Sequence, residues 1–177
     1  MLELSLRYWG DPVLTQRASE IQDIDGKVAA LAEGMLGTMH EARGLGLAAP
    51  QVGVQRRLFI YQMGEDAEPI TVVNPSIVET DGEWEYEEGC LSLPGLYFPI
   101  VRPKQVHMVG WDLDGNELSI EADEVEARCL QHELDHLDGR LLLERLDKGQ
   151  RRKALRELRR RGELSTAATD TGPGREG

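Results

Sequence analysis

The stretch Gln131-His132-Glu133-Leu134-Asp135-His136 carries an H-E-x-x-H pattern inside a segment with the apolar periodicity of a helix. Four residues separate the two histidines, so on a helix both imidazoles lie on one face and can bind one metal ion, with Glu133 beside them. This arrangement is typical of a hydrolytic metal site, in which the glutamate is a general base rather than a ligand. We therefore expect His132 and His136 to be metal ligands and Glu133 to be catalytic.

The flanking residues predict where this helix begins and ends. Asp123 can cap the first turn, which also contains the acidic residues Glu124 and Glu126, and Gly139 can end the helix. Its apolar positions are Val125, Cys129, Leu130, Leu134 and Leu137. The alternative is an ordinary amphipathic helix whose two histidines are satisfied by hydrogen bonds.

Two imidazoles need a third protein ligand, and its identity separates the families that share this helix pattern. The longer peptidase signature would place a third histidine at position 142, which holds Leu142. The other peptidase arrangement uses a glutamate on a following helix, for which only Glu144 and Glu157 are available. Glu144 follows the helix closely and Glu157 lies in a run of arginines, so neither glutamate is convincing.

The two cysteines are the remaining candidates. Cys129 lies roughly 10 Å along the helix axis from His136, which is too far for both side chains to bind one ion. Cys90 lies in a segment punctuated by glycine and proline, Glu88–Gly95, where a loop could bring its thiolate to the helix. We expect Cys90 to be the third ligand and Cys129 to pack beside the site; the alternative for Cys90 is a buried, inert thiol.

A third segment, Gly44-Leu45-Gly46-Leu47-Ala48-Ala49-Pro50-Gln51-Val52-Gly53, is rich in glycine and apolar residues and carries a single amide side chain. Its glycines would let the backbone of a substrate come close, and the Gln51 amide offers two N–H donors. Taken alone, the segment is more simply interpreted as a tight turn, because the basic or hydroxyl partner of a phosphate loop is missing.

The rest of the chain predicts short strands and one further long helix. An apolar stripe over residues 25–43 predicts a helix that ends at Gly44. Strands are expected over residues 57–63, 70–74, 76–80, 106–111 and 117–121, the last two joined by a hairpin turn at Asp114-Gly115. We therefore expect an α+β fold with antiparallel sheets packed around the central H-E-x-x-H helix, an N-terminal helix and a basic C-terminal helix.

Together the three motif-bearing segments resemble the peptide deformylase family, whose members carry G-x-G-x-A-A-x-Q, E-G-C-x-S and Q-H-E-x-D-H in this order. The matching residues are Gly44–Gln51, Glu88–Ser92 and Gln131–His136. The resemblance extends from Asp11-Pro12-Val13-Leu14 to about Leu146. One departure is Tyr97, at a position where many relatives have a basic residue.

The resemblance implies an enzyme that removes the formyl group from the N-formylmethionyl ends of new polypeptides and releases formate. It also implies Fe²⁺ as the metal, whereas thiolate and imidazole ligands equally suit Zn²⁺, Ni²⁺ or Co²⁺. Two other interpretations share the same helix. They are a metallopeptidase that cleaves peptide bonds, and a non-catalytic metal-binding protein in which a fourth ligand closes the site.

The residues themselves suggest how the reaction would proceed. Attack on a formamide carbon needs activated water and a stabilised oxyanion, and a metal with an open fourth position meets both needs. We expect Glu133 to take a proton from water and to deliver it to the leaving amine. The Gln51 amide would meet the oxyanion, together with, as the resemblance implies, the backbone N–H of Leu91.

The expected substrate contacts lie around these catalytic groups. Apolar side chains would form a pocket for the methionine side chain; they are Leu45, Leu91, Val125 and Cys129. Glycines would leave backbone groups open to the peptide main chain; they are Gly44, Gly46 and Gly89.

Composition agrees with a small enzyme. A chain of 177 residues with 40% hydrophobic content suits one domain, which we expect over residues 1–163, followed by a disordered tail over 164–177. No stretch approaches a membrane span and no targeting segment is evident. Two cysteines do not suggest a disulfide framework, so we expect a cytoplasmic protein.

Charge is concentrated near the C-terminus. Residues 145–161 contain nine lysines and arginines against Asp147 and Glu157, a net charge of +7, whereas the whole chain carries −12 and the remainder therefore −19. The helix expected over 145–162 is either a solvated helix end or a surface that docks on the phosphates of ribosomal RNA. The second interpretation suits an enzyme that acts on chains leaving the ribosome.

Overall fold

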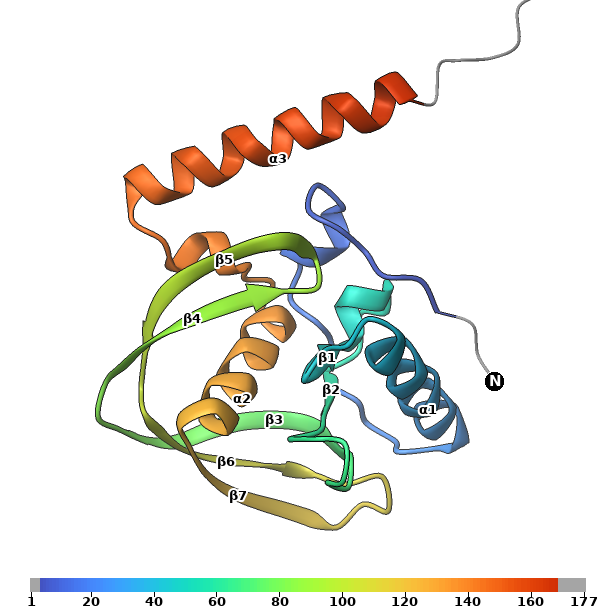
Figure 1. Ribbon diagram of the computed structural model, residues 1–177. Coiled ribbons are helices and arrows are strands. Elements are labelled where there is room, and N and C mark those ends of the chain that lie inside the picture. The colour runs from blue at the N-terminus through green and yellow to red at the C-terminus, as the bar shows by residue number, and fades with distance from the viewer. Residues whose placement is uncertain (1–3, 169–177) are drawn as a thin grey trace, which may run out of the picture. The chain divides into compact units, whose positions relative to one another are not determined.

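Helix α2 (Glu124–Leu137), which carries the H-E-x-x-H pattern, lies between two antiparallel sheets (Figure 1). This computed structural model describes residues 4–168, with side chains as far as residue 162. They form two compact units that divide between residues 142 and 143. The first contains α1 (Gly26–Glu41), α2 and both sheets, and the second contains α3 (Lys148–Ala168). The predicted α+β class with a central helix is confirmed.

The larger sheet has five strands in the order β1-β2-β3-β6-β7, and β4 pairs only with β5. All pairings are antiparallel. The strands are β1 (Gly46–Ala48), β2 (Leu58–Tyr61), β3 (Ile70–Asp81), β4 (Trp84–Cys90), β5 (Leu93–Arg102), β6 (Gln105–Trp111) and β7 (Glu117–Asp123). Three short 3₁₀ helices complete the elements: Pro12–Thr15, Ala49–Val52 and Leu142–Arg145.

The sequence did not predict β1, β4 or β5. Strand β4 reads Trp-Glu-Tyr-Glu-Glu-Gly-Cys and lacks the alternation of a half-buried strand, while β5 contains two prolines and a glycine. Prolines are tolerated in β5 because it belongs to a two-stranded sheet, where a missing N–H interrupts few ladder hydrogen bonds. Cys90 therefore ends a strand rather than lying in a loop.

Strand β3 replaces the two strands predicted on either side of Pro75. Residues 70–73 pair with β2, Val73 and the stretch 76–81 pair with β6, and the β6 register is irregular between Val73 and Ser76. Pro75 thus falls in the irregular part of the β6 ladder and beyond the end of the β2 ladder, so its missing N–H removes little from either. Neighbouring Asn74 has a φ of 49° and exchanges two hydrogen bonds with the backbone of Ile21, at 2.9 and 2.8 Å.

The two long helices of the first unit begin differently. Asp25 caps α1 by accepting hydrogen bonds from the backbone N–H groups of Lys27 and Val28, as its sequence position suggests. The predicted cap of α2 by the Asp123 side chain is wrong, because that side chain makes no capping hydrogen bond. Asp123 instead ends β7, and Glu124, with a φ of 46°, makes the sharp turn from strand to helix.

Two groups of buried side chains form the core of the first unit. One lies between α2 and the larger sheet and includes Phe59, Met108 and Leu130, none of which is exposed. The other joins α1 to β1 and β2 and includes Met35 and Met39, so these methionines are core residues. The buried side of α2 is thus fixed against the sheet.

The second unit consists mainly of the basic helix. Asp147 caps α3 by accepting from the backbone N–H of Gln150 at 2.8 Å. The helix extends to Ala168, past residue 164 where the predicted tail begins, and the disordered tail stays a prediction. The leucine and alanines in this stretch are good helix formers. Residues 169–177 of the predicted tail lie outside the described part, and the domain boundary at residue 163 stays a prediction.

No helix within residues 4–168 has the length and apolar character to span a membrane.

Gly139 ends α2 as predicted, with a φ of +71°, and a Cβ added there would lie 2.8 Å from the carbonyl carbon of Gln16. We expect Gly139→Ala to lower the free energy of unfolding by about 2–3 kcal/mol, because both strain and overlap with backbone oppose the methyl group. Gly115→Ala is the control, since Gly115 has a φ of +82° but open space around its Cα. It should cost about 1 kcal/mol. The free energies of unfolding are measured by urea denaturation. Equal decreases in the two variants would contradict the overlap with the Gln16 backbone.

Candidate metal centre

Three potential donor atoms, one from β4 and two from α2, lie close together. Cys90 comes from the end of β4, and His132 and His136 lie one turn apart on α2. The Nε2 atom of His136 lies 3.3 Å from the Cys90 Sγ and 3.1 Å from the His132 Nε2. All three donor atoms lie within 4.8 Å of one another. The structure therefore brings together the three side chains that the sequence nominates as ligands.

This donor set fits a divalent transition metal. One thiolate and two imidazoles suit zinc, iron, nickel or cobalt, and the separations resemble those between neighbouring ligands of a tetrahedral ion with bonds of about 2.0–2.3 Å. The Nδ1–H of His132 donates to the Glu88 carboxylate at 2.6 Å, which directs the Nε2 lone pair toward the other donors. Burial alone would raise the pKa of the Cys90 thiol, but the imidazoles of His136 and His132 lower it well below its usual value. The thiol is thus disposed toward the thiolate that binds metals.

Glu88 is the centre of a buried ionic network that the sequence analysis missed. Arg102 donates to both of its oxygens, at 2.9 and 2.6 Å, and Arg128 donates to Oε2 at 2.7 Å. Arg102 also donates to Asp135 at 2.9 Å. Two signals pointed to this network: metal-bound histidines usually donate to a carboxylate, and Arg128 lies one turn before His132 on the same helix face.

The predicted catalytic carboxylate is buried beside the donor set. Glu133 is only 3% exposed, and among the described residues its Oε2 has no hydrogen-bond partner. Burial raises the pKa of its carboxyl to about 7, so protonated and ionised forms are both accessible near neutral pH. Gly46 on β1 leaves room for the Glu133 carboxylate, because a Cβ there would lie 2.6 Å from Glu133 Oε1 and 2.9 Å from the Cys129 Sγ.

The Gln51 amide is held with its N–H donors toward the centre. Its Oε1 accepts a hydrogen bond from the backbone N–H of Ala48 at 2.9 Å, which fixes the orientation of the amide. Its Nε2 donates to the Ser92 hydroxyl at 3.3 Å and to the Cys90 Sγ at 3.8 Å. Gln51 thus belongs to a 3₁₀ helix and to the site, and the simple-turn interpretation is incomplete.

A pocket of about 460 Å³ opens beside these groups. It is lined by all six residues predicted to bind substrate: Gly44, Leu45, Gly46, Gly89, Val125 and Cys129. Gln51, Cys90, Leu91, His132 and Glu133 also line it, whereas His136 does not. The structure thus places the nominated binding residues around one cavity that reaches the metal centre.

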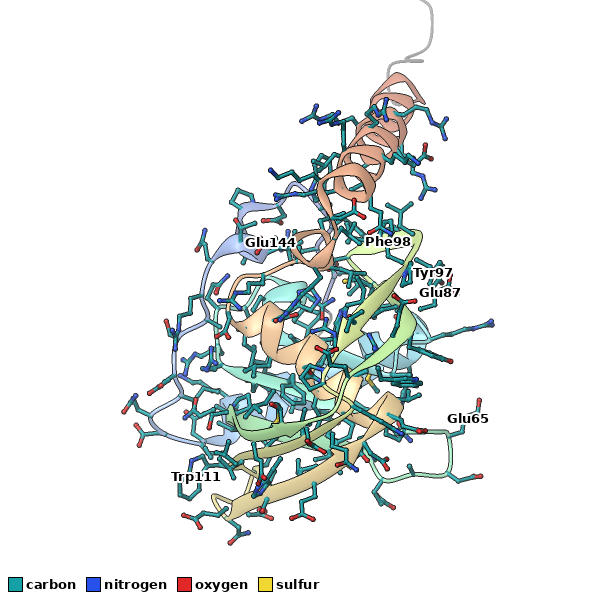
Figure 2. The ribbon with its side chains drawn as sticks, turned by 90° about the vertical axis from the view of Figure 1, so that its left-hand side faces the viewer. Glu65, Glu87, Tyr97, Phe98, Trp111 and Glu144 are labelled. Atoms are coloured by element: carbon teal, nitrogen blue, oxygen red, sulfur yellow. The ribbon has the colours of Figure 1, made fainter. Side chains whose placement is uncertain are left out.

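Arg128 and Tyr97 also line the pocket and were not predicted to do so. Tyr97 projects outward from the β4–β5 hairpin near Glu87 and is 64% exposed (Figure 2). Its ring packs directly on its cross-strand partner Gly89, where a Cβ would lie 2.6 Å from the ring. The aromatic ring thus forms part of the pocket wall on the hairpin.

An open-sided donor set, a buried carboxylate and a substrate-sized pocket define a mononuclear metal-dependent hydrolase. The family model for polypeptide deformylase matches residues 4–152. The chain belongs to the polypeptide deformylase family, whose members are metal-dependent enzymes.

Relatives and solved structures agree with this assignment. A peptide deformylase of Agathobacter rectalis is 46% identical over 143 residues, which cover 81% of this chain and 89% of that protein. One from Acidothermus cellulolyticus is 42% identical over 154 residues, or 87% and 84% of the two chains. The crystal structure of a peptide deformylase from Legionella pneumophila has a TM-score of 0.88 at 38% identity and covers 93% and 98% of the two chains. That of Ehrlichia chaffeensis peptide deformylase in complex with actinonin has a TM-score of 0.86 at 37% identity and covers 91% and 98%.

Replacing each cysteine separately tests the ligand set. We expect Cys90→Ser to lose most of the bound metal, because a serine hydroxyl does not supply a thiolate at neutral pH. Cys129→Ser should retain the metal, since the Cys129 side chain is buried against Gly46 and Glu133 rather than against the imidazoles. Metal content per chain after gel filtration is the measurement. Equal metal content in both variants would contradict the assignment of Cys90.

Proposed function

We propose that this protein removes the formyl group from N-formylmethionyl ends of newly made polypeptides and releases formate. One observation carries the proposal. Cys90, His132, the Glu133 carboxylate and the Gln51 amide line one pocket of about 460 Å³, and His136 completes the donor set behind its wall. The relatives that this chain matches over most of their length are named peptide deformylase.

Cys90, His132 and His136 would hold the metal. A divalent ion bound there supplies Lewis acidity, which makes water a stronger nucleophile near neutral pH and draws electron density from the formyl oxygen. We propose Fe²⁺ as the ion in the cell, with Zn²⁺, Ni²⁺ or Co²⁺ as possible replacements, since the donor set accepts all four. Metal analysis of protein purified without oxygen tests this choice.

Glu133 would carry the proton. Its ionised carboxylate accepts a proton from the attacking water, and its protonated form then donates that proton to the leaving amine. The pKa of about 7, raised by burial, makes both transfers feasible at neutral pH. Its unpartnered Oε2 leaves one acceptor for that proton.

The oxyanion that forms on the formyl group would be met by two N–H donors. The Gln51 amide is held by Ala48 and faces the Cys90 sulfur. The backbone N–H of Leu91 follows Cys90 directly at the end of β4. Such pre-oriented donors stabilise developing charge without reorganising during the reaction.

The peptide main chain would lie between β1 and β4. The five-stranded sheet ends at β1, and β4 pairs only with β5, so each strand has an edge without a strand partner in the described region. Gly46 on β1 and Gly89 on β4 keep these edges open to a third strand. The first side chain would then enter the pocket near Leu45, Val125 and Cys129.

We expect formate release from formyl-Met-Ala-Ser by the wild-type protein, no release from the acetyl-Met analogue and no cleavage of casein. Glu133→Ala should retain its metal but lose nearly all activity, because the carboxylate that would carry the proton is removed. Casein cleavage would support a peptidase, and metal binding without either reaction would support a non-catalytic protein. An active Glu133→Ala variant would contradict the proton-carrying role.

Gln51→Leu tests the oxyanion donor. Leucine fills a similar volume but has no N–H, so we expect kcat to fall about 100-fold or more, with a much smaller rise in KM. This corresponds to about 3 kcal/mol of barrier. Steady-state kinetics with formyl-Met-Ala-Ser give both constants, and metal content is the control because Gln51 also contacts the Cys90 sulfur. Unchanged turnover would remove Gln51 from the mechanism.

We further propose that this protein is cytoplasmic and that α3 contacts ribosomal RNA. The exposed basic residues Arg151, Arg152 and Lys153 lie on this helix, whose region carries a net charge of +7. We expect their joint replacement by glutamine to weaken ribosome binding and to flatten its dependence on salt. A matched triple variant of exposed cations in the first unit, Arg17, Lys27 and Arg56 to glutamine, should bind like wild type. Equal binding by the two triple variants would contradict this contact.

A further inference from the structure

The imidazole of His132 is anchored through a carboxylate that other residues hold in place. Its Nδ1–H donates to Glu88 Oε1 at 2.6 Å. The corresponding nitrogen of His136 has no hydrogen-bond partner among the described residues. The orientation of the His132 imidazole therefore depends on Glu88, and whatever fixes Glu88 acts on this metal ligand.

Two arginines donate hydrogen bonds to the Glu88 carboxylate. Arg102, from β5, donates to both carboxylate oxygens. Arg128, from α2, donates to Oε2 at 2.7 Å and to the Trp84 carbonyl at 2.7 Å. Oε2 therefore receives one hydrogen bond from each arginine, while Oε1 is shared between Arg102 and His132.

Arg128 is itself rigidly held. It is only 5% exposed, and its guanidinium lies 5.3 Å from the centre of the Trp84 ring and 5.9 Å from that of Tyr86. Stacking and two hydrogen bonds leave this guanidinium little freedom. Since Trp84 and Glu88 belong to β4, Arg128 also ties the strand of Cys90 to the helix of both histidines.

The network brings four buried ionisable side chains together around Glu88. Glu88 and Asp135 contribute two negative charges, and Arg102 and Arg128 contribute two positive charges. All four side chains are buried. Removing Arg128 would leave Glu88 with one fewer donor, so the carboxylate would gain rotational freedom beside His132.

We propose that Arg128 is a positioning residue for the metal centre: it fixes the Glu88 carboxylate, which in turn sets the orientation of the His132 imidazole. The effect of Arg128 on metal binding does not depend on the proposed function; only its effect on turnover rests on that function. Arg128 also lines the pocket, so the side chain that enters the pocket lies against the same residue that steadies the metal ligand.

Metal affinity tests the proposal without reference to activity. We expect Arg128→Met to weaken Zn²⁺ binding about tenfold in competition with a chelator and to shift the visible absorption bands of the Co²⁺ form. Arg128→Lys retains the charge but not the fork of donors, and it should recover part of the loss. If Arg128→Met does not give a folded protein by circular dichroism, the lysine variant is measured in its place and should bind Zn²⁺ more weakly than wild type.

Arg57→Met is the matched control. Arg57 is also a buried arginine at α2, where it donates to the Asp138 carboxylate at 2.8 Å and to the Leu137 carbonyl at 3.2 Å, but it touches neither Glu88 nor the pocket. Its loss should lower stability while Zn²⁺ affinity stays within twofold of wild type. Zn²⁺ affinities that are equal in Arg57→Met and Arg128→Met would overturn the proposal.

A double-mutant cycle tests whether Arg128 acts through Glu88. Glu88→Gln alone should weaken Zn²⁺ binding, and adding Arg128→Met should then cost less than a further twofold. Fully additive losses would show that Arg128 acts by another route and would overturn the proposal. Wild-type protein that binds Zn²⁺ but releases no formate would refute the proposed function and leave this cycle interpretable.

Discussion

The contact between Glu88 and α2 is the interaction on which the metal centre depends. Cys90 belongs to a hairpin of only two strands, and such a sheet is marginally stable unless it packs against another element. The two histidines belong to a helix that is fixed separately against the five-stranded sheet. The donors meet because Glu88, close to Cys90 in β4, reaches His132 and the arginine of the same helix.

Such a buried ionic cluster is costly, and its role is better understood as specification than as stabilisation. Four charges removed from water lose hydration that their mutual attraction only roughly repays. An apolar contact could join the hairpin to α2 with as much stability, but it would permit sliding and rotation. Hydrogen bonds between Glu88, Arg102 and Asp135 allow one arrangement, and the donor atoms then lie within 4.8 Å of one another.

Much of the fold and site could be predicted because the signals were local. The i, i+4 spacing of the histidines, the stop at Gly139 and the stripe of α1 each depend on a few neighbouring residues. Strands β4 and β5 escaped prediction because their glutamates, prolines and glycines are explained only by partners from elsewhere in the chain. The same holds for the role of Arg128, which depends on Glu88 and on the Trp84 carbonyl, both supplied by β4.

The absence of a side chain at Gly46 brings the edge of β1 directly against the acid–base group. Since a β-carbon there would occupy the space of the Glu133 carboxylate, the strand edge and the acid–base group share one wall with nothing between them. A peptide that paired with this edge, as proposed above, would lie against the wall that carries the carboxylate. Because Glu133 is only 3% exposed in the free protein, little bulk water would have to leave the carboxylate when such a peptide docks.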